Sequence, residues 1–141
     1  MTELTWIRER LPVWDAPKAR IVGQAPAGVF DTRYAELTEG APVPGEWWRA
    51  EREGAVVGYG WLEVVWGDAE VLLATAPEAR RQGVGAFVLE QLEREARARG
   101  LRYLYNVVRP THPAAAEVAA WLTERGFRPS EDGRLLRTIV R

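Results

Sequence analysis

The segment from residue 84 to residue 99 constrains the fold more than any other part of the chain. Its apolar residues recur at helical spacing, and they are Val84, Phe87, Val88, Leu92 and Ala96. The opposite face carries three acid–arginine pairs spaced four residues apart, and Gly100 is placed to end the helix. Apolar runs at 70–75 and 103–108 flank this helix. The three segments predict a β-α-β crossover, which makes the two strands parallel and puts the helix on one face of the sheet.

The rest of the chain predicts hairpin-linked strands and shorter helices around this unit. Turn signals stand at Glu53-Gly54 and at Gly67-Asp68. We expect strands at 4–8, 46–52, 56–66 and 135–140, and a return strand that begins at Gly126-Phe127. We expect helices at 15–22 with Asp15 as N-cap, at 31–38, and from Thr111 or His112 to Arg125. The sequence therefore predicts a single domain, residues 1–141, of the α+β (mixed α/β) class with a mixed sheet.

Rare residue types exclude several classes of function. The 141-residue chain has no cysteine, which excludes disulfides, thiolate nucleophiles and cysteine-bound metals. Its single histidine, His112, excludes a multi-histidine metal site, and its single serine, Ser130, lies in no Gly-x-Ser-x-Gly motif. Its single lysine, Lys18, leaves no Gly-Lys-Thr/Ser phosphate loop. These absences favour binding, or chemistry carried by a bound cosubstrate, over chemistry on a protein nucleophile.

Charge and hydropathy bear on partners and location. The chain has 19 basic and 20 acidic residues and a formal net charge of −1, which gives no general attraction to nucleic acid or an anionic membrane. No apolar run approaches the roughly 18 residues of a transmembrane helix, and the first residues do not have the pattern of a signal peptide. We therefore expect no nucleic-acid partner, no membrane and no leader, and the lack of cysteine fits a cytoplasmic protein.

A glycine-containing loop carries the most specific chemical signal. The stretch that joins the apolar strand to the long helix reads Pro77-Glu78-Ala79-Arg80-Arg81-Gln82-Gly83-Val84-Gly85-Ala86. A helix start has unpaired N–H groups and partial positive charge, and the two glycines let a phosphate approach the main chain, so the amides of 82–86 suit a diphosphate. The alternative is a glycine-assisted helix entry without a ligand. A dinucleotide fingerprint is disfavoured, because Val88 stands where a third glycine is needed.

The motif Arg80-x-x-Gly83-x-Gly85 is similar to the Arg/Gln-x-x-Gly-x-Gly/Ala motif of the GNAT superfamily of acyl-CoA-dependent N-acyltransferases. The order and spacing of the elements resemble that superfamily as well, down to a helix that ends in Gly126-Phe127 before two strands. The resemblance covers residues 70–141 well and residues 1–69 only by element order. It implies a mostly antiparallel sheet with a central splayed parallel pair and helices on both faces.

The resemblance also implies a reaction. An acyl-CoA, most simply acetyl-CoA, is the cosubstrate; its acyl group moves directly to a primary amine, without an acyl-enzyme and without a metal. The diphosphate of coenzyme A lies on the amides of the glycine loop, and the pantetheine arm pairs with the end of the preceding strand. The cofactor-binding residues so implied are Leu73, Ala74, Thr75, Arg80, Arg81, Gln82, Gly83, Val84, Gly85 and Ala86. A main-chain N–H near Ala74 or Thr75 is expected to stabilise the oxyanion, and a homodimer is a further family-level expectation.

The chain departs from the superfamily at the general acid. Many members have a tyrosine four residues before the glycine of the Gly126-Phe127 pair, where this chain has Leu122. Many also have an asparagine near the start of that helix, where this chain has alanines at 114–116. Either another group or water protonates the departing thiolate, or the protein is a catalytically weak or inactive acyl-CoA-binding module. A domain that binds ATP or NAD is a third hypothesis.

Glu70 is the first candidate for the general base, because it begins the strand that would hold the thioester, where some members carry a catalytic glutamate. A solvent-facing or arginine-paired carboxylate is the alternative interpretation. Glu63 is the second candidate. His112 is the third, although its surroundings are typical of a helix cap. Trp47 or Trp48 either packs in the core or lines an acceptor cleft, and no motif identifies the acceptor.

Overall fold

The computed structural model describes residues 3–23, 37–108 and 112–139. The helices and strands in chain order are β1 (Thr5–Glu9), α1 (Ala16–Lys18), the π-helical turn η1 (Ala19–Gly23), β2 (Glu46–Arg52), β3 (Ala55–Val65), β4 (Asp68–Thr75), the 3-10 turn η3 (Pro77–Ala79), α2 (Val84–Ala98), β5 (Tyr103–Asn106), α3 (Ala115–Glu124), β6 (Arg128–Pro129) and β7 (Leu135–Thr138). Strands β1 to β4 and α2 follow the predicted ranges to within two residues. The helix predicted at 31–38 lies almost wholly outside the described residues.

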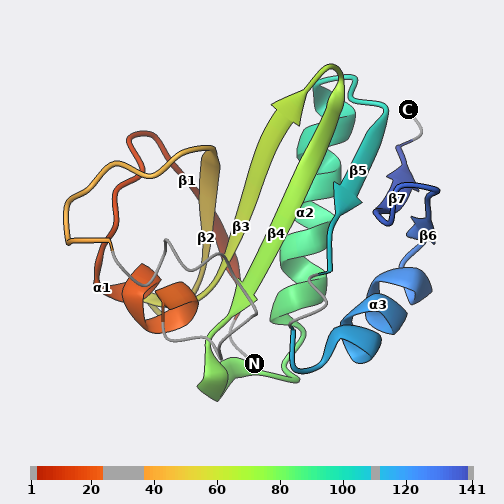
Figure 1. The fold of residues 1–141 in the computed structure, drawn as a ribbon. Helices are drawn as coiled ribbons and strands as arrows, with labels where there is room; N and C mark the ends of the chain where they lie inside the picture. The colour runs from red at the N-terminus through yellow and green to blue at the C-terminus, as the bar shows by residue number, and fades with distance from the viewer. Residues whose placement is uncertain (1–2, 24–36, 109–111, 140–141) are drawn as a thin grey trace.

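The described strands form one sheet in the order β1-β2-β3-β4-β5-β7-β6 (Figure 1). Neighbouring strands are antiparallel except β4 and β5, which are parallel. The crossover from β4 through α2 to β5 is the unit that the helical periodicity predicted. The predicted class, α+β with a mixed and mostly antiparallel sheet, is confirmed.

Two-residue turns close the central hairpins. Glu53-Gly54 joins β2 to β3, and Trp66-Gly67 joins β3 to β4. All four turn residues have positive φ, as a type I′ turn requires. The turn predicted at Gly67-Asp68 was therefore wrong by one residue, because Asp68 already pairs with the end of β3.

Helices lie on both faces of the sheet, as predicted. Gly58 and Gly60 of β3 face α2: a Cβ built on Gly58 would lie 2.7 Å from Val84 Cγ1, and one built on Gly60 would lie 2.9 Å from Val88 Cγ1. The missing side chains let α2 pack directly against the strand. Tyr59 alternates to the opposite face, where α1 and η1 lie (Figure 1).

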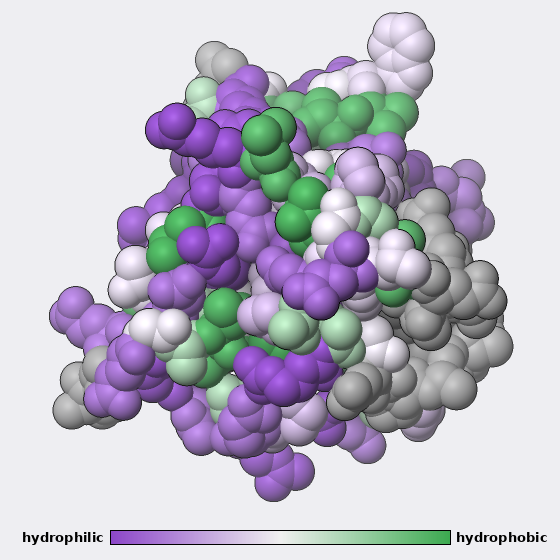
Figure 2. Space-filling model, turned by 90° about the vertical axis from the view of Figure 1, so that its left-hand side faces the viewer, coloured by the Kyte–Doolittle hydropathy of each residue, from purple (hydrophilic) through white to green (hydrophobic). Residues whose placement is uncertain are grey.

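The predicted helix at 15–22 forms, but in two parts. Asp15 is its N-cap, because its Oδ1 accepts the N–H of Lys18 at 3.0 Å. The α-helical part ends at Lys18, and the chain continues as the π-helical turn η1. Figure 2 shows that the outer surface on this side of the molecule is mainly polar, with small separate apolar areas.

Lys18 is fully buried beneath this surface. Its Nζ lies 2.5 Å from Glu9 Oε1 and 3.3 Å from Asp15 Oδ2. The same nitrogen lies 5.2 Å from the ring centroids of both Trp47 and Tyr59. Two carboxylates and two aromatic faces thus compensate a charge that would otherwise be strongly unfavourable in the interior.

Candidate active site

The sheet opens between its two parallel strands. Residues 68–70 of β4 pair with residues 103–105 of β5, and the pairing stops there. Asn106 Nδ2 then donates to Val71 O at 2.8 Å, and β5 ends at Asn106, not at residue 108 as predicted. In the described part of the chain, β4 runs on to Thr75 without a strand on this edge. The splayed parallel pair that the resemblance implied is confirmed.

Within the described part of the chain, the main chain of β4 presents hydrogen-bonding groups without a strand partner to this opening. Ala76 N–H donates to Val57 O at 2.8 Å, so the alternation of an antiparallel ladder turns residues 72, 74 and 76 toward β3. Residues 71, 73 and 75 then turn their N–H and C=O groups away from β3. The bond that Val71 O accepts from Asn106 agrees with this direction. Leu73 and Thr75 therefore face the opening, and Ala74 is corrected: its main chain faces β3.

The glycine loop lies at one end of the opening. Gly83 is the N-cap of α2 with φ of +80°, and Arg81 has φ of +62°. Phe87 N–H donates to Gly83 O at 3.0 Å, so the amides of residues 84–86 precede the first intrahelical bond. A Cβ built on Gly85 would lie 3.5 Å from Trp121 of α3, which puts α3 beside the N-terminus of α2.

The opening and the loop form one cleft of about 770 Å³. Nine of the predicted site residues line it: Glu70, Leu73, Thr75, Arg80, Arg81, Gly83, Val84, Gly85 and Ala86. Ala74 and Gln82 are not among its lining residues. The Gln82 side chain instead accepts a hydrogen bond from Arg52 Nη1 at 2.5 Å and donates one to Glu78 O at 3.2 Å.

Two carboxylates lie side by side on the cleft wall. Glu63 and Glu70 are register partners on β3 and β4, so their side chains share the face of the sheet opposite α2. Tyr105 is the parallel register partner of Glu70, and the Arg134 guanidinium lies 4.6 Å from its ring centroid. Burial raises the pKa of the Tyr105 phenol, and the charge of Glu70 adds to the rise. This wall suits a cationic group and contains both carboxylates that were predicted as candidate bases.

Leu122 and His112 lie on the α3 side of the cleft. Leu122 is 2% exposed and supplies no proton donor where many members of the superfamily have tyrosine. His112 Nδ1 accepts the N–H of Ala114 at 2.9 Å, so the neutral ring carries its proton on Nε2. His112 therefore has the predicted helix-entry bond and also lines the cleft, while Thr111, the other predicted cap, lies outside the described residues.

Some lining residues were missed in the sequence, among them Trp61, Asn106, Trp121 and Arg125. The only local signal for Asn106 was a polar residue inside an apolar strand. Trp47 and Trp48 are both buried and neither lines the large cleft. Trp48 stacks on Trp6 with ring centroids 5.9 Å apart, which agrees with the core-packing alternative for this residue.

A mixed sheet that opens between its parallel strands, with a helix N-terminus at the opening, is a distinctive α+β architecture. The chain belongs to the acetyltransferase (GNAT) family, whose sequence profile matches residues 9–127. It is similar to the amino-acid acetyltransferase of Pseudomonas fluorescens (strain Pf0-1), with 40% identity over 88 residues, which are 60% of this chain and 19% of that protein. The chain thus spans about a fifth of the length of the curated relatives that it matches.

Solved structures share the fold at low sequence identity. The ribosomal-protein-S18-alanine N-acetyltransferase from Escherichia coli matches all of this chain and 96% of its own, with a TM-score of 0.67 and 23% identity. N-acetylglutamate synthase from Neisseria gonorrhoeae, crystallised with coenzyme A and N-acetyl-glutamate, matches 99% of this chain and 36% of its own, with a TM-score of 0.71 and 21% identity. None of the helices among the described residues is long and apolar enough to cross a membrane.

Proposed function

We propose that this protein transfers an acyl group from an acyl-CoA, in the first place acetyl-CoA, directly to a primary amine of a small molecule or peptide. The observation that carries the proposal is the opening between β4 and β5, with the start of α2 at one end. An extended pantetheine arm fits the free main-chain groups of Leu73 and Thr75, and a diphosphate fits the amides at residues 84–86 with Arg80 and Arg81 beside them.

Glu70 is the proposed general base. A lysine-like amine has a pKa of about 10.4 and arrives mostly as an ammonium, so its proton must leave before attack. Glu70 and Glu63 both line the cleft on the face opposite α2 and would attract the ammonium. The attack forms the N–C bond, and a main-chain N–H of Leu73 or Thr75 is the proposed donor to the oxyanion. Collapse of this tetrahedral intermediate breaks the C–S bond and releases the thiolate of coenzyme A. Since a thiolate is a tolerable leaving group, Leu122 does not preclude turnover.

Binding of coenzyme A to the loop is tested by calorimetry on Gly83→Glu. A Cβ on Gly83 meets nothing within 4 Å, so the substitution adds charge and bulk without a clash, at the expense of strain from the positive φ. Gly40→Glu is the matched control, because Gly40 also has positive φ and open space around its Cβ. We expect Gly83→Glu to weaken coenzyme A binding at least 10-fold while the control matches wild type. Equal affinity in two folded variants would refute the loop assignment, and tighter binding of ATP or NAD would end the acyltransferase hypothesis.

Turnover separates an enzyme from a binding module. The names of the relatives put amino acids and peptides with a free N-terminus first in the panel of acceptors. We expect acetyl-CoA consumption with at least one amine, and we expect Glu70→Gln to slow that turnover by about two orders of magnitude or more. The second candidate, an acyl-CoA-binding module, rests on the buried Leu122. Tight coenzyme A binding without turnover, in wild type and in Leu122→Tyr alike, would favour it.

Two further proposals concern the cell and the assembly. We propose a cytoplasmic location, which the cysteine-free sequence supports and which cell fractionation tests. A homodimer also stays a prediction, for which sedimentation of the purified chain is the measurement.

A further inference from the structure

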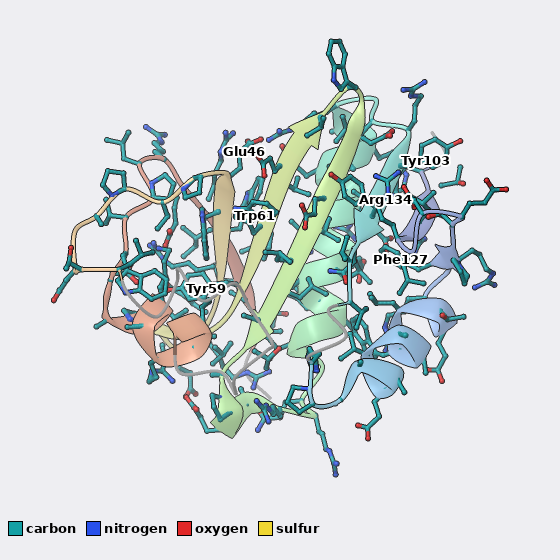
Figure 3. All side chains as sticks on the ribbon, in the orientation of Figure 1. Glu46, Tyr59, Trp61, Tyr103, Phe127 and Arg134 are labelled. Atoms are coloured by element: carbon teal, nitrogen blue, oxygen red, sulfur yellow. The ribbon has the colours of Figure 1, made fainter. Side chains whose placement is uncertain are left out.

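Among the described residues, a side chain makes the bond that follows the last ladder pair of β4 and β5. The pairing ends with Glu70 and Tyr105, and Asn106 Nδ2 then donates to Val71 O at 2.8 Å. Asn106 is the only asparagine of the chain, and it is half-buried on the wall of the cleft. Figure 3 shows Tyr103 at the paired end of β5, and Asn106 lies at the other end, where the opening begins.

Val107 is the residue that would extend this ladder by one step. Continued pairing in the observed register would place it opposite Leu72. In a parallel ladder, Val107 N–H would then donate to Val71 O, and Val107 O would accept from Leu73 N–H. Valine is a β-branched residue that favours extended structure, so its own propensity does not prevent this step. Asn106 already occupies Val71 O, and the step is therefore blocked.

The blocked step leaves the N–H of Leu73 to the opening. A side-chain carboxamide competes with a strand because it offers the main chain an equivalent hydrogen-bond partner. Since the side chain of Asn106 stands between the two main chains, it satisfies Val71 O and keeps β5 at a distance from β4. Without this side chain, Val107 and a bound ligand would compete for the same Leu73 N–H.

We propose that Asn106 is a positioning residue, a side-chain spacer that ends the β4–β5 ladder at Val71 and keeps Leu73 N–H available to the acyl-CoA. The inference rests on the proposed function for the identity of the ligand, whereas the spacing itself is a property of the free protein. It goes further by assigning the point at which the sheet opens to one side chain.

The first test is Asn106→Leu, which removes the donor and keeps the branching at Cγ. We expect Val107 to bond to Val71 O in this variant. Hydrogen exchange followed by NMR should then be at least about 10-fold slower at the Val107 amide than in wild type. Calorimetry should show coenzyme A binding weakened by about 10-fold or more, while the free energy of unfolding stays equal or rises. Loss of a purely structural contact would instead lower the stability without protecting Val107.

The second test combines Asn106→Leu with Val107→Pro. Proline has no N–H and cannot donate to Val71 O, so the ladder cannot extend and the opening should return. Residue 106 is in a strand, a conformation that is compatible with a following proline. We expect the double variant to bind coenzyme A within about threefold of wild type. Val107→Pro alone is the matched control and should also bind within about threefold, because wild-type Asn106 already blocks that donor.

The outcomes separate the two proposals. Failure of wild type to bind coenzyme A, together with slowed Val107 exchange in Asn106→Leu, would overturn the proposed function and support the spacer. Unchanged Val107 exchange in folded Asn106→Leu would overturn the spacer alone, and so would a folded double variant that binds no better than Asn106→Leu. If Asn106→Leu does not fold, Asn106→Ala removes the same donor, and its Val107 exchange must slow in the same way.

Discussion

Substitution of Lys18 by methionine tests whether the buried ion pair holds α1 against the sheet. Methionine keeps most of the side-chain volume but removes the ammonium, which leaves Glu9 buried with Arg49 Nη1, at 3.2 Å, as its remaining cationic partner among the described residues. Removal of one member of a buried pair typically destabilises a protein by about 3–5 kcal/mol. Because Arg49 stays and Asp15 reaches solvent, we expect Lys18→Met to lower the free energy of unfolding by about 3 kcal/mol.

Urea denaturation gives the free energy of unfolding, and thermal unfolding should show a midpoint lower by roughly 6–12 °C for a chain of this length. The matched variant is Lys18→Met combined with Glu9→Gln, which removes both charges. It should recover at least about 1 kcal/mol relative to Lys18→Met alone, because the buried Glu9 carboxylate that has lost its Lys18 partner is then neutral glutamine. A loss below about 1 kcal/mol in Lys18→Met, or a double variant no more stable than the single one, would refute the reasoning.

Three further predictions concern stability. Arg99 lowers the pKa of Glu46 through a hydrogen-bonded ion pair at 2.6 Å, so the pair stabilises the fold above the ordinary carboxyl pKa of 4.5, and this stabilisation is lost as pH falls through the lowered pKa. Glu46→Gln should therefore lower the free energy of unfolding by about 1 kcal/mol at pH 7 and leave it unchanged near pH 2. An equal loss at both pH values would contradict this. Trp66 is 89% exposed and occupies a left-handed turn position, which asparagine adopts more readily than tryptophan. Trp66→Asn should therefore raise the free energy of unfolding by about 1 kcal/mol and the thermal midpoint by a few degrees. A lower midpoint would show that the indole has a stabilising partner. A Cβ on Gly60 would lie 2.7 Å from Trp6 Cη2, so Gly60→Ala should destabilise by about 1–3 kcal/mol in urea denaturation, and a neutral effect would mean that α2 can shift.

The long helix and its crossover were predictable because their signals are local. Helical periodicity sets α2, Gly100 directly follows its C-cap, and Pro77 follows the end of β4. The end of β5 was not predictable in the same way. Val107 and Val108 favour extended structure, but a strand also needs a partner, and β4 has already diverged at that point. A propensity of single residues contains no information about where two neighbouring strands separate.

The site residues also differ in whether a local sequence signal identifies them. The motif at residues 80–85 identified the loop because a helix entry is a local structure. Trp61 and Asn106 reach the cleft only through strand register, which depends on pairings between distant parts of the chain. The direction of the Ala74 amide was not predictable for the same reason. Neighbouring residues on β4 turn their amides to opposite edges of the strand, and the register with β3 decides which residues face the opening.

The gap beside β4 makes part of this strand an edge in the middle of a sheet. Exposed edges normally invite other chains to add a strand, and they are a common route to aggregation. Here α2 and α3 flank the edge, and we propose that the edge pairs with an extended, amide-containing ligand in the cleft. On this proposal, the unpaired edge of β4 recognises a ligand by main-chain hydrogen bonds, the same kind of bond through which an exposed edge would recruit another chain.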